Sequence, residues 1–256
     1  MNDMSLKNKW IGQSTPRPDG IDKVTGSAQY AADFTMPGMV WGKVLRSPHA
    51  HALIKKINTS KAEKLKGVLA VMTGEDLPLL PLDVPLPTGP NDIRWISRGC
   101  MAQEKILYTG QPVAAVAAIS KSVAEAALEL IEVDYEVLPH VIDVDEAMAP
   151  DAPILHDWLK TDGIDGPTNI ASTMVVEAGD VEQGFAEADL VIEREFKSAA
   201  VHQGYIEPQA CTVSYKPDSQ STIWSSSQGQ FMVRSLTAAI TGMATGDIKA
   251  IPAEIG

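Results

Sequence analysis

The segment from Pro112 to Leu138 constrains the fold of this chain more than any other. Its first part, Pro112 to Ile119, is apolar throughout, which is typical of a buried strand. Ser122 to Leu130 then has a helical pattern and begins with a capping-box sequence, Ser122 to Glu125. From Ile131 to Leu138 apolar and acidic residues alternate, which predicts a strand with one solvated face. This succession of strand, helix and strand indicates an α/β layer.

The acidic residues of this segment admit two interpretations. Glu132, Asp134 and Glu136 are spaced closely enough to suggest paired catalytic carboxylates. Strand alternation alone already explains why they face water. We therefore assign them to a solvated face of the sheet.

Composition shifts along the chain predict four segments. The first is polar and rich in proline and glycine, which predicts an extended leader. A later cluster of Pro, Asp and Gly, at 149–169, predicts a linker. Within the first domain, residues 78–99 hold five prolines and predict a long loop. The expected organisation is a leader at 1–22, an α/β domain at 23–148, the linker at 149–169 and a second domain at 170–256.

Short patterns predict the remaining elements. In the first domain we expect strands at 39–46, 52–57 and 68–72 and a helix at 60–65. In the second domain Asp180 is the expected N-cap of a short helix. Strands are expected there at 190–197, 210–215, 221–225 and 248–251, with a helix from Gly229 whose apolar stripe predicts core packing.

Charge and cysteine usage exclude several classes of protein. The net charge of −12 and the pI near 4.8 argue against sequence-independent binding to nucleic acid or to an anionic membrane. No apolar run has the length of a membrane span, and we expect a cytoplasmic protein. Cys100 and Cys211 lack the spacing of a zinc or iron–sulfur site. His49 and His51 are two apart, which on a strand puts both imidazoles on one face, but no nearby carboxylate or third histidine completes a metal site. We therefore interpret them as surface or loop histidines.

The stretch from Thr222 to Phe231 is the main candidate for chemistry. It is interpreted as a strand followed by a helix, with Ser227, Gln228 and Gly229 at the junction. Free backbone N–H groups at a helix N-terminus suit an anionic cofactor. An ordinary strand-to-helix turn has the same composition, so a generic small-anion site and a plain turn both stay open at this point.

Five stretches occur in the order and spacing of a known family. They read RPDGIDKVTG at 17–26, LRSPHAH at 45–51, YTGQPVAAVAA at 108–118, VHQGYIEPQACTV at 201–213 and WSSSQGQFMVR at 224–234. Together they resemble the molybdenum-binding subunit of the xanthine dehydrogenase and aldehyde oxidase family, the molybdenum hydroxylases. Landmarks in register over almost the whole chain are far more specific than any single motif.

The resemblance implies an α/β fold: a hammerhead domain followed by the first part of a molybdopterin-binding domain. Members of the family hydroxylate N-heterocycles, purines or aldehydes with oxygen derived from water, and some oxidise carbon monoxide. They use molybdenum bound to a molybdopterin dinucleotide. Their electrons leave through 2Fe–2S clusters and usually FAD on partner chains or domains, so the resemblance implies a hetero-oligomer.

One catalytic position is implied by a motif that is present. Gln228 matches the family glutamine whose side-chain amide hydrogen-bonds an oxo ligand of molybdenum, and a neutral amide donor suits a developing negative oxygen. Ser227 and Gly229 flank it, and their backbone N–H groups are expected to help hold the cofactor. His202, Tyr205 and Glu207 lie in the fourth landmark, and we expect them to be structural.

Other family features are expected outside this sequence. The resemblance places a glycine-rich cofactor-contacting segment just after Gly256, with the later pterin-binding loops and the catalytic carboxylate base far beyond it. The leading hypothesis is therefore a subunit or split portion of a molybdenum hydroxylase whose site other chains complete. The alternative is a catalytically inactive fragment that acts at most as a binding or assembly module. The substrate is not specified by the residues present.

Overall fold

A computed structural model describes residues 10–77, 99–157 and 161–256. By its internal contacts the chain divides into two units. One combines the N-terminal segment up to Met36 with residues 204–238 and 243–256, and the other comprises residues 37–203 and 239–242. Within the described residues no helix is long and apolar enough to cross a membrane. The long loop expected at 78–99 lies outside the described residues except for Gly99.

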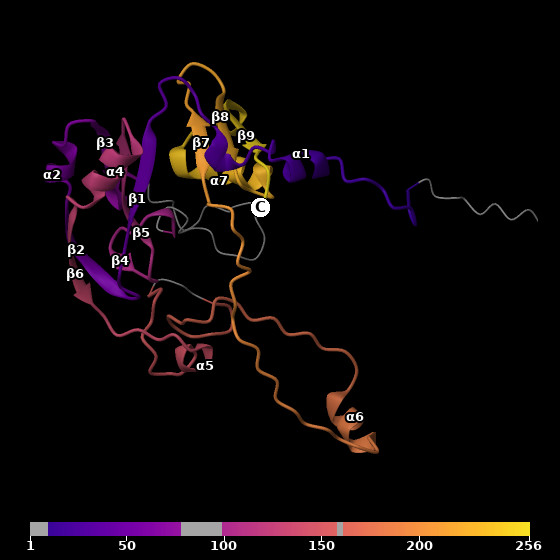
Figure 1. Cartoon of the computed structure of the whole chain (residues 1–256). Helices are drawn as coiled ribbons and strands as arrows, with labels where there is room; N and C mark the ends of the chain where they lie inside the picture. Colours follow the sequence, from indigo (N-terminus) through magenta and orange to yellow (C-terminus); the bar gives the residue numbers. More distant parts are fainter. Residues whose placement is uncertain (1–9, 78–98, 158–160) are drawn as a thin grey trace, which may run out of the picture. The chain divides into compact units, whose positions relative to one another are not determined.

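The larger unit is built on two antiparallel sheets of three strands (Figure 1). One sheet has the order β1, β5, β3, and the other has the order β4, β2, β6. Its strands are β1 (Trp41–Arg46), β2 (Ala52–Asn58), β3 (Val68–Thr73), β4 (Lys105–Ile106), β5 (Pro112–Ala118) and β6 (Glu132–Val137). Its helices are α2 (Ser60–Glu63), α4 (Lys121–Leu128), α5 (Val144–Ala147) and α6 (Val181–Glu187), with a 3-10 turn at Gly74–Asp76.

Strand β5 is the centre of this unit. It lies between β1 and β3, and its buried residues belong to both hydrophobic clusters. Val116 packs with Ala124 and Ala127 of α4, while Val113 packs with Ile106 in the second cluster. The prediction of a buried apolar strand at this position is confirmed, and small alanines let α4 approach the sheet closely.

Two details of the strand–helix–strand segment differ from expectation. The helix begins at Lys121, and its N-cap is Ser120, whose hydroxyl accepts a hydrogen bond from the Val123 N–H. Ser122 is therefore already inside the helix. Strands β5 and β6 also belong to different sheets, because the chain returns from α4 to pair β6 with β2 rather than with β5.

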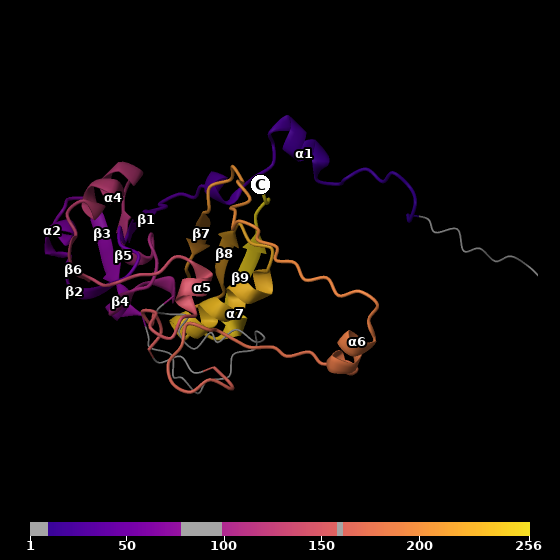
Figure 2. The same cartoon turned by 90° about the horizontal axis from the view of Figure 1, so that it is seen from below.

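The smaller unit contains a three-stranded sheet in the order β7, β8, β9. Strands β7 and β8 form an antiparallel hairpin, whereas β8 and β9 are parallel and are connected through helix α7 (Figures 1 and 2). The strands predicted at 210–215, 221–225 and 248–251 and the helix predicted from Gly229 are confirmed. The elements are α1 (Gly20–Thr25), a 3-10 turn at Ala31–Asp33, β7 (Cys211–Ser214), β8 (Ser221–Ser225), α7 (Gln230–Thr241), a 3-10 turn at Thr245–Asp247 and β9 (Ile248–Pro252).

The apolar stripe of α7 is not buried as core packing requires. No residue of this helix is buried, and the Met232 side chain is 45% exposed. The expectation that the whole stripe lies in a core is therefore wrong for this chain by itself, since one sheet of three short strands does not cover it.

The strand predicted at 190–197 is not formed. This segment has no regular secondary structure, and Leu190, Ile192 and Phe196 are 74%, 68% and 89% exposed. None of the strand pairings among the described residues includes it. A strand needs a partner ladder for its backbone groups, so its sequence pattern alone does not produce one. The short helix α6 before it forms as expected, with the Asp180 side chain accepting from the Gln183 N–H.

Gly74 offers a test of the packing in the larger unit. A Cβ at this position would clash with the backbone carbonyl oxygen of Ala102 and lie 2.8 Å from Cγ of Gln103. We expect Gly74→Ala to lower the free energy of unfolding by about 1–3 kcal/mol, as overpacking does. Urea denaturation followed by circular dichroism measures the change. Gly42→Ala is the matched control, because nothing lies within 4 Å of its added Cβ, and a similar loss in both variants would contradict the account.

Candidate functional site

The candidate site lies in the smaller unit, where β8 and β9 end; the side of the sheet at which their carboxyl ends lie is called the carboxyl edge. Because β8 and β9 are parallel, both strands end at the same edge. The segment Ser226 to Gln228 leaves β8 there, and Ala253 to Gly256 leaves β9 there. The Ala253 N–H donates to the Ser225 carbonyl at 2.9 Å, which holds the two exits side by side. In open α/β sheets, ligands bind at this carboxyl edge.

The turn between β8 and α7 is fixed mainly by its serines. The Ser226 hydroxyl donates to the Ala210 carbonyl at 3.4 Å, and the Gly229 N–H donates to Ser227 Oγ at 3.1 Å. The Val233 N–H donates to the Gly229 carbonyl at 3.0 Å, which begins the helix. The Gly229 N–H is thus already used within the turn. Cofactor contacts from Ser227 and Gly229 stay a prediction.

Gln228 is the exposed residue of this turn. Among the described residues, no hydrogen bond holds its side-chain amide, whereas its neighbours on both sides are fixed. The structure therefore presents a neutral amide from a rigid turn at the carboxyl edge of two parallel strands. An amide in this position is able to donate to an oxygen of a bound group.

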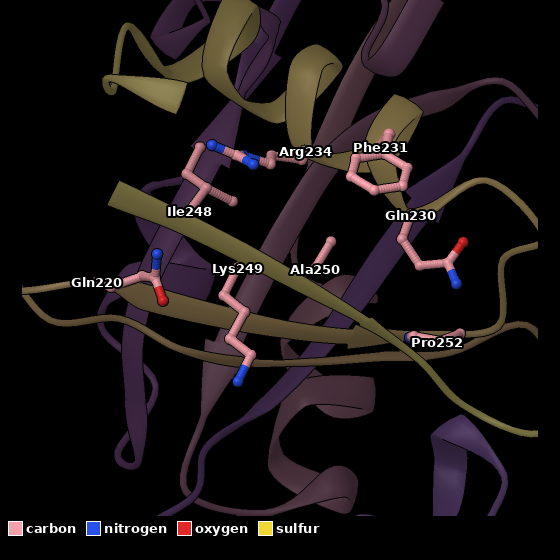
Figure 3. A pocket seen from close by; sticks show the side chains of 8 residues that line it. All are labelled: Gln220, Gln230, Phe231, Arg234, Ile248, Lys249, Ala250 and Pro252. Carbon is pink, nitrogen blue, oxygen red and sulfur yellow. The ribbon is translucent and has the colours of Figure 1, made fainter. Parts of the chain in front are cut away.

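A hollow of about 280 Å³ lies between the start of α7 and strand β9 (Figure 3). Ile248 and Ala250 point toward the helix side of β9, and Lys249 points to the other side (Figure 3). The walls are mainly apolar, with an arginine, a lysine and two amides among them. The lining residues are Gln220, Gln230, Phe231, Arg234, Ile248, Lys249, Ala250 and Pro252.

The polar groups that face this hollow also fix the hairpin and the helix. Arg234 Nε donates to the Thr245 carbonyl at 2.7 Å, and Gln220 Nε2 donates to the Gly246 carbonyl at 2.9 Å. These bonds hold the turn that leads into β9. We therefore interpret Arg234 and Gln220 as structural groups of the turn rather than as a ready-made anion site.

The N-terminal segment closes the other side of the β9 exit. The Glu254 N–H donates to the Gln29 carbonyl at 3.2 Å, and Tyr30 forms a parallel bridge with Glu254. Lys23 Nζ lies 3.1 Å from a Glu254 carboxylate oxygen and donates to the Ile255 carbonyl at 3.2 Å. The landmark at 17–26 therefore acts by holding the exit of β9 in place.

We call the contact of Lys23 with Glu254 and the Ile255 carbonyl the tie. The charged groups around it shift the pKa values of Lys23 and Asp19. The hydrogen bond to Glu254 raises the pKa of Lys23, with a second contribution from Asp19. The hydrogen bond from Arg17 in turn holds the pKa of Asp19 far below its usual range. Both groups are solvent-accessible, so we expect these pairs to weaken with salt.

Other sequence candidates take structural positions. The expectation of surface histidines is wrong for His51, which is buried and whose Nδ1 lies 2.6 Å from the Pro139 carbonyl. The His49 ring packs edge-on against Tyr135 at 5.0 Å. No group of three metal-ligating side chains occurs in the part of the chain that the structure describes. His202 and Tyr205 lie on the segment before β7, where His202 is exposed and Tyr205 is half-buried.

Two family models match the sequence. Residues 25–139 match the aldehyde oxidase and xanthine dehydrogenase a/b hammerhead domain, and residues 164–256 match the molybdopterin cofactor-binding domain. The chain belongs to the xanthine dehydrogenase and aldehyde oxidase family. The two sheets of the larger unit are thus part of a hammerhead domain, and the sheet of the smaller unit is part of a molybdopterin-binding domain.

Curated relatives cover almost all of this chain. The carbon monoxide dehydrogenase large chain of Afipia carboxidovorans is 37% identical over 257 residues, which is 98% of this chain and 31% of the relative. A probable xanthine dehydrogenase subunit of Bacillus subtilis is 34% identical, covering 95% of this chain and 30% of the relative. The chain therefore spans about a third of the length of these relatives.

A shorter relative and the solved structures agree with this assignment. The nicotinate dehydrogenase large molybdopterin subunit of Eubacterium barkeri is 28% identical over 96% of this chain, which corresponds to 54% of that relative. Reconstituted CO dehydrogenase from Oligotropha carboxidovorans has a TM-score of 0.76 at 35% identity, covering 96% of this chain and 31% of its own. Quinoline 2-oxidoreductase from Pseudomonas putida 86 has a TM-score of 0.80 at 26% identity, covering 98% and 31%.

The side chains that hold the segments following β8 and β9 in place were not predicted from the sequence. The Lys23–Glu254 pair joins residues more than two hundred positions apart, and no local pattern reveals such a contact. The motif RPDGIDKVTG was the available signal, because it is one of the family landmarks although it lies in a polar leader. The role of Glu207, which contacts Gly256, was also missed.

Replacement of Lys23 tests the tie. We expect Lys23→Met to increase amide hydrogen exchange of residues 253–256, since it removes both the ion pair and the bond to the Ile255 carbonyl. Hydrogen-exchange mass spectrometry measures this, and high salt is expected to reproduce part of the effect in the unchanged protein. Lys64→Met is the control, because Lys64 makes no ion pair among the described residues. Equal exchange in both variants would refute the tie.

The pH dependence of this tie has a defined sign. Because the folded pKa of Lys23 is raised, its contribution is fully present below the ordinary lysine pKa of 10.5. It is lost as the pH rises through the folded value. We therefore expect the stability difference between the unchanged chain and Lys23→Met to be constant near neutrality and to shrink above pH 10.5, as measured by denaturation at each pH.

Proposed function

We propose that this chain is the N-terminal portion of the molybdenum subunit of a molybdenum hydroxylase and that Gln228 belongs to its catalytic centre. The reaction is the oxidative hydroxylation of an N-heterocycle, a purine or an aldehyde with oxygen from water. Residues outside this sequence complete the site. The proposal rests on family membership together with one structural observation: the Gln228 amide, unpaired among the described residues, stands at the carboxyl edge of β8 and β9.

The residues present fit an oxygen-bearing, anionic cofactor. The Gln228 amide is neutral and held on a rigid turn, so it is able to donate without adding charge to the group it contacts. Ser227 and Gly229 keep the turn in place through the bond between Gly229 N–H and Ser227 Oγ. When bound, the molybdenum–pterin group supplies the two-electron redox chemistry. The protein's part is to hold that group and orient a donor toward it.

Exposed apolar surface supports the proposal that further residues of the subunit pack against this chain. Helix α7 has no buried residue, and the segment 190–197 exposes Leu190, Ile192 and Phe196. Soluble domains rarely leave so many large apolar side chains uncovered unless another surface packs on them. Relatives in which this chain corresponds to 30–31% of the length carry the additional residues that such packing needs.

Partner chains follow from the same proposal. The relatives are named as a large chain and as subunits, which supports an assembly of several chains. We propose that one partner carries the remaining molybdenum-binding portion and that others carry 2Fe–2S clusters and FAD. The molybdenum–pterin dinucleotide is then shared between this chain and the first partner.

The exposed apolar segment also favours a second candidate, a non-catalytic fragment that acts at most as a binding or assembly module. The two candidates differ in one measurement. Affinity purification of the chain from its native cells, with its partners, is expected to yield a complex that contains molybdenum and pterin. A bound partner with the remaining portion but no molybdenum would contradict the catalytic proposal. Limited proteolysis that leaves a core ending near residue 150 would support the fragment.

Gln228 carries the catalytic prediction. In the assembled, molybdenum-loaded complex we expect Gln228→Ala to lower kcat by about 10²–10³-fold, the usual cost of removing one donor at a developing oxyanion. The molybdenum content is expected to stay unchanged, because a single side-chain contact does not hold the cofactor. Gln183→Ala is the control, since its amide bonds Glu187 on α6. Unchanged kcat in Gln228→Ala would remove this residue from the mechanism.

A further inference from the structure

Glu207 holds the backbone at the end of the β9 exit. Its Oε2 accepts a hydrogen bond from the Gly256 N–H at 2.6 Å, a short distance typical of a charged acceptor. The two residues are 49 positions apart, so the contact depends on the folded arrangement rather than on local sequence. It is the last along the chain of several hydrogen bonds and ion pairs that hold residues 253–256.

The second oxygen of this carboxylate is buried and unsatisfied. Among the described residues, Glu207 Oε1 has no hydrogen-bond partner although its surface is inaccessible to solvent. A buried, unpaired carboxylate oxygen is costly, and native structures nearly always give such an atom a donor. Glu207 therefore has the capacity to hold one more N–H or O–H group beside Gly256.

Gly256 approaches the Glu207 side chain so closely that no other residue fits. A Cβ on Gly256 would lie 2.6 Å from Cβ of Glu207, a distance that real contacts do not reach. The backbone of residue 256 thus rests directly on the stem of the glutamate while its N–H meets the carboxylate. These two contacts define both the position and the direction of the chain at this point.

This contact point belongs to the same edge as Gln228. The β8 and β9 exits are joined by the bond from Ala253 N–H to the Ser225 carbonyl, and Gln228 lies three residues beyond Ser225. Gly256 lies three residues beyond Ala253, so both Gln228 and Gly256 follow closely on the point where this bond joins the two strands. Because Glu207 fixes the Gly256 backbone, we expect it to act on the site indirectly, through Gly256, rather than by touching a bound group itself.

We propose that Glu207 is a positioning residue of the catalytic site: its carboxylate fixes the Gly256 backbone through Oε2 and takes a second donor through Oε1. That donor is an N–H or O–H group from the residues that complete the site. The proposal rests on the proposed function for its catalytic consequence, whereas the contact with Gly256 stands by itself. It replaces the expectation that Glu207 serves only to satisfy its neighbours.

Three substitutions separate the effect of the length of the Glu207 side chain from the effect of its charge. Glu207→Gln keeps an acceptor oxygen at the same distance but makes the bond neutral, so it is expected to keep part of the effect. Glu207→Asp keeps the charge but is one methylene shorter, about 1.5 Å, and is expected to behave like Glu207→Ala. Glu193→Gln, on the exposed segment before β7, controls for the loss of one negative charge.

Selective labelling isolates the contact in the full chain. Glycine follows isoleucine only at Gly12 and Gly256, so carbonyl-labelled isoleucine with nitrogen-labelled glycine leaves two amide resonances. We expect the Gly256 amide proton to be shifted downfield by the carboxylate and to move upfield in Glu207→Gln. In Glu207→Asp and Glu207→Ala its exchange protection is expected to fall by about 10- to 100-fold. The Gly12 resonance is expected to stay in place.

Two outcomes would overturn the proposal. An unchanged Gly256 resonance in Glu207→Ala means that the contact is not formed. A Glu207→Asp variant equal to the unchanged chain, with Glu207→Gln equal to Glu207→Ala, means that charge rather than reach matters. This experiment needs no molybdenum, so it does not depend on the proposed function.

The assembled complex supplies the catalytic half of the test. We expect kcat to fall from the unchanged complex to Glu207→Gln and further to Glu207→Asp, which lies close to Glu207→Ala, while KM and molybdenum content change little. A common loss of molybdenum in all variants would overturn the positioning role in favour of a structural one. Absence of molybdenum from the unmodified complex would instead refute the proposed function and leave the Gly256 contact to be judged by its resonance.

Discussion

The parallel pairing of β8 with β9 is the constraint on which the candidate site depends. A parallel pair brings the carboxyl ends of both strands to one edge, and it needs a crossover connection, which helix α7 supplies here. The bond from the Ala253 N–H to the Ser225 carbonyl extends the ladder past β9 and keeps the exits together. The segments that carry Gln228 and Gly256 therefore leave the sheet at the same edge because of backbone pairing rather than because of their own side chains. Substitutions that leave the ladder intact change the chemistry of this edge without moving it.

The N-terminal segment explains how so small a sheet keeps its edge ordered. Three strands with one helix bury little apolar surface, and α7 itself has no buried residue. Polar contacts supply the order instead: Lys23 holds Glu254 and the Ile255 carbonyl, and Gln29 receives the Glu254 N–H. Phe34 adds an aromatic contact with Trp224 at 5.9 Å. Segments from both ends of the sequence thus form one unit, which is why residues up to Met36 group with the second sheet rather than with the hammerhead sheets.

Sequence patterns predicted most of the elements because those elements are stabilised locally or by a core within the chain. The strand at Pro112–Ala118 follows from its continuous apolar run and helix α7 from its helical apolar spacing. The family landmarks singled out Gln228, whose catalytic role stays a prediction. The sheet assignment of β6 could not be predicted, because pairing with β2 is a long-range choice. Nor could the Lys23–Glu254 tie or the contact between Glu207 and Gly256, since both join distant residues. The predicted domain boundaries, the cytoplasmic location and the cofactor roles of Ser227 and Gly229 stay predictions.

The unformed strand at 190–197 shows where local propensity stops being sufficient. Its residues have the composition of a strand, yet Phe196 is 89% exposed and the backbone has no ladder among the described residues. Strand formation requires a partner edge, whereas the helix α6 just before it satisfies its own backbone and forms. A segment of this kind becomes a strand only when another surface supplies the edge. Under the proposed function, we expect the residues that complete the site to supply this edge as well.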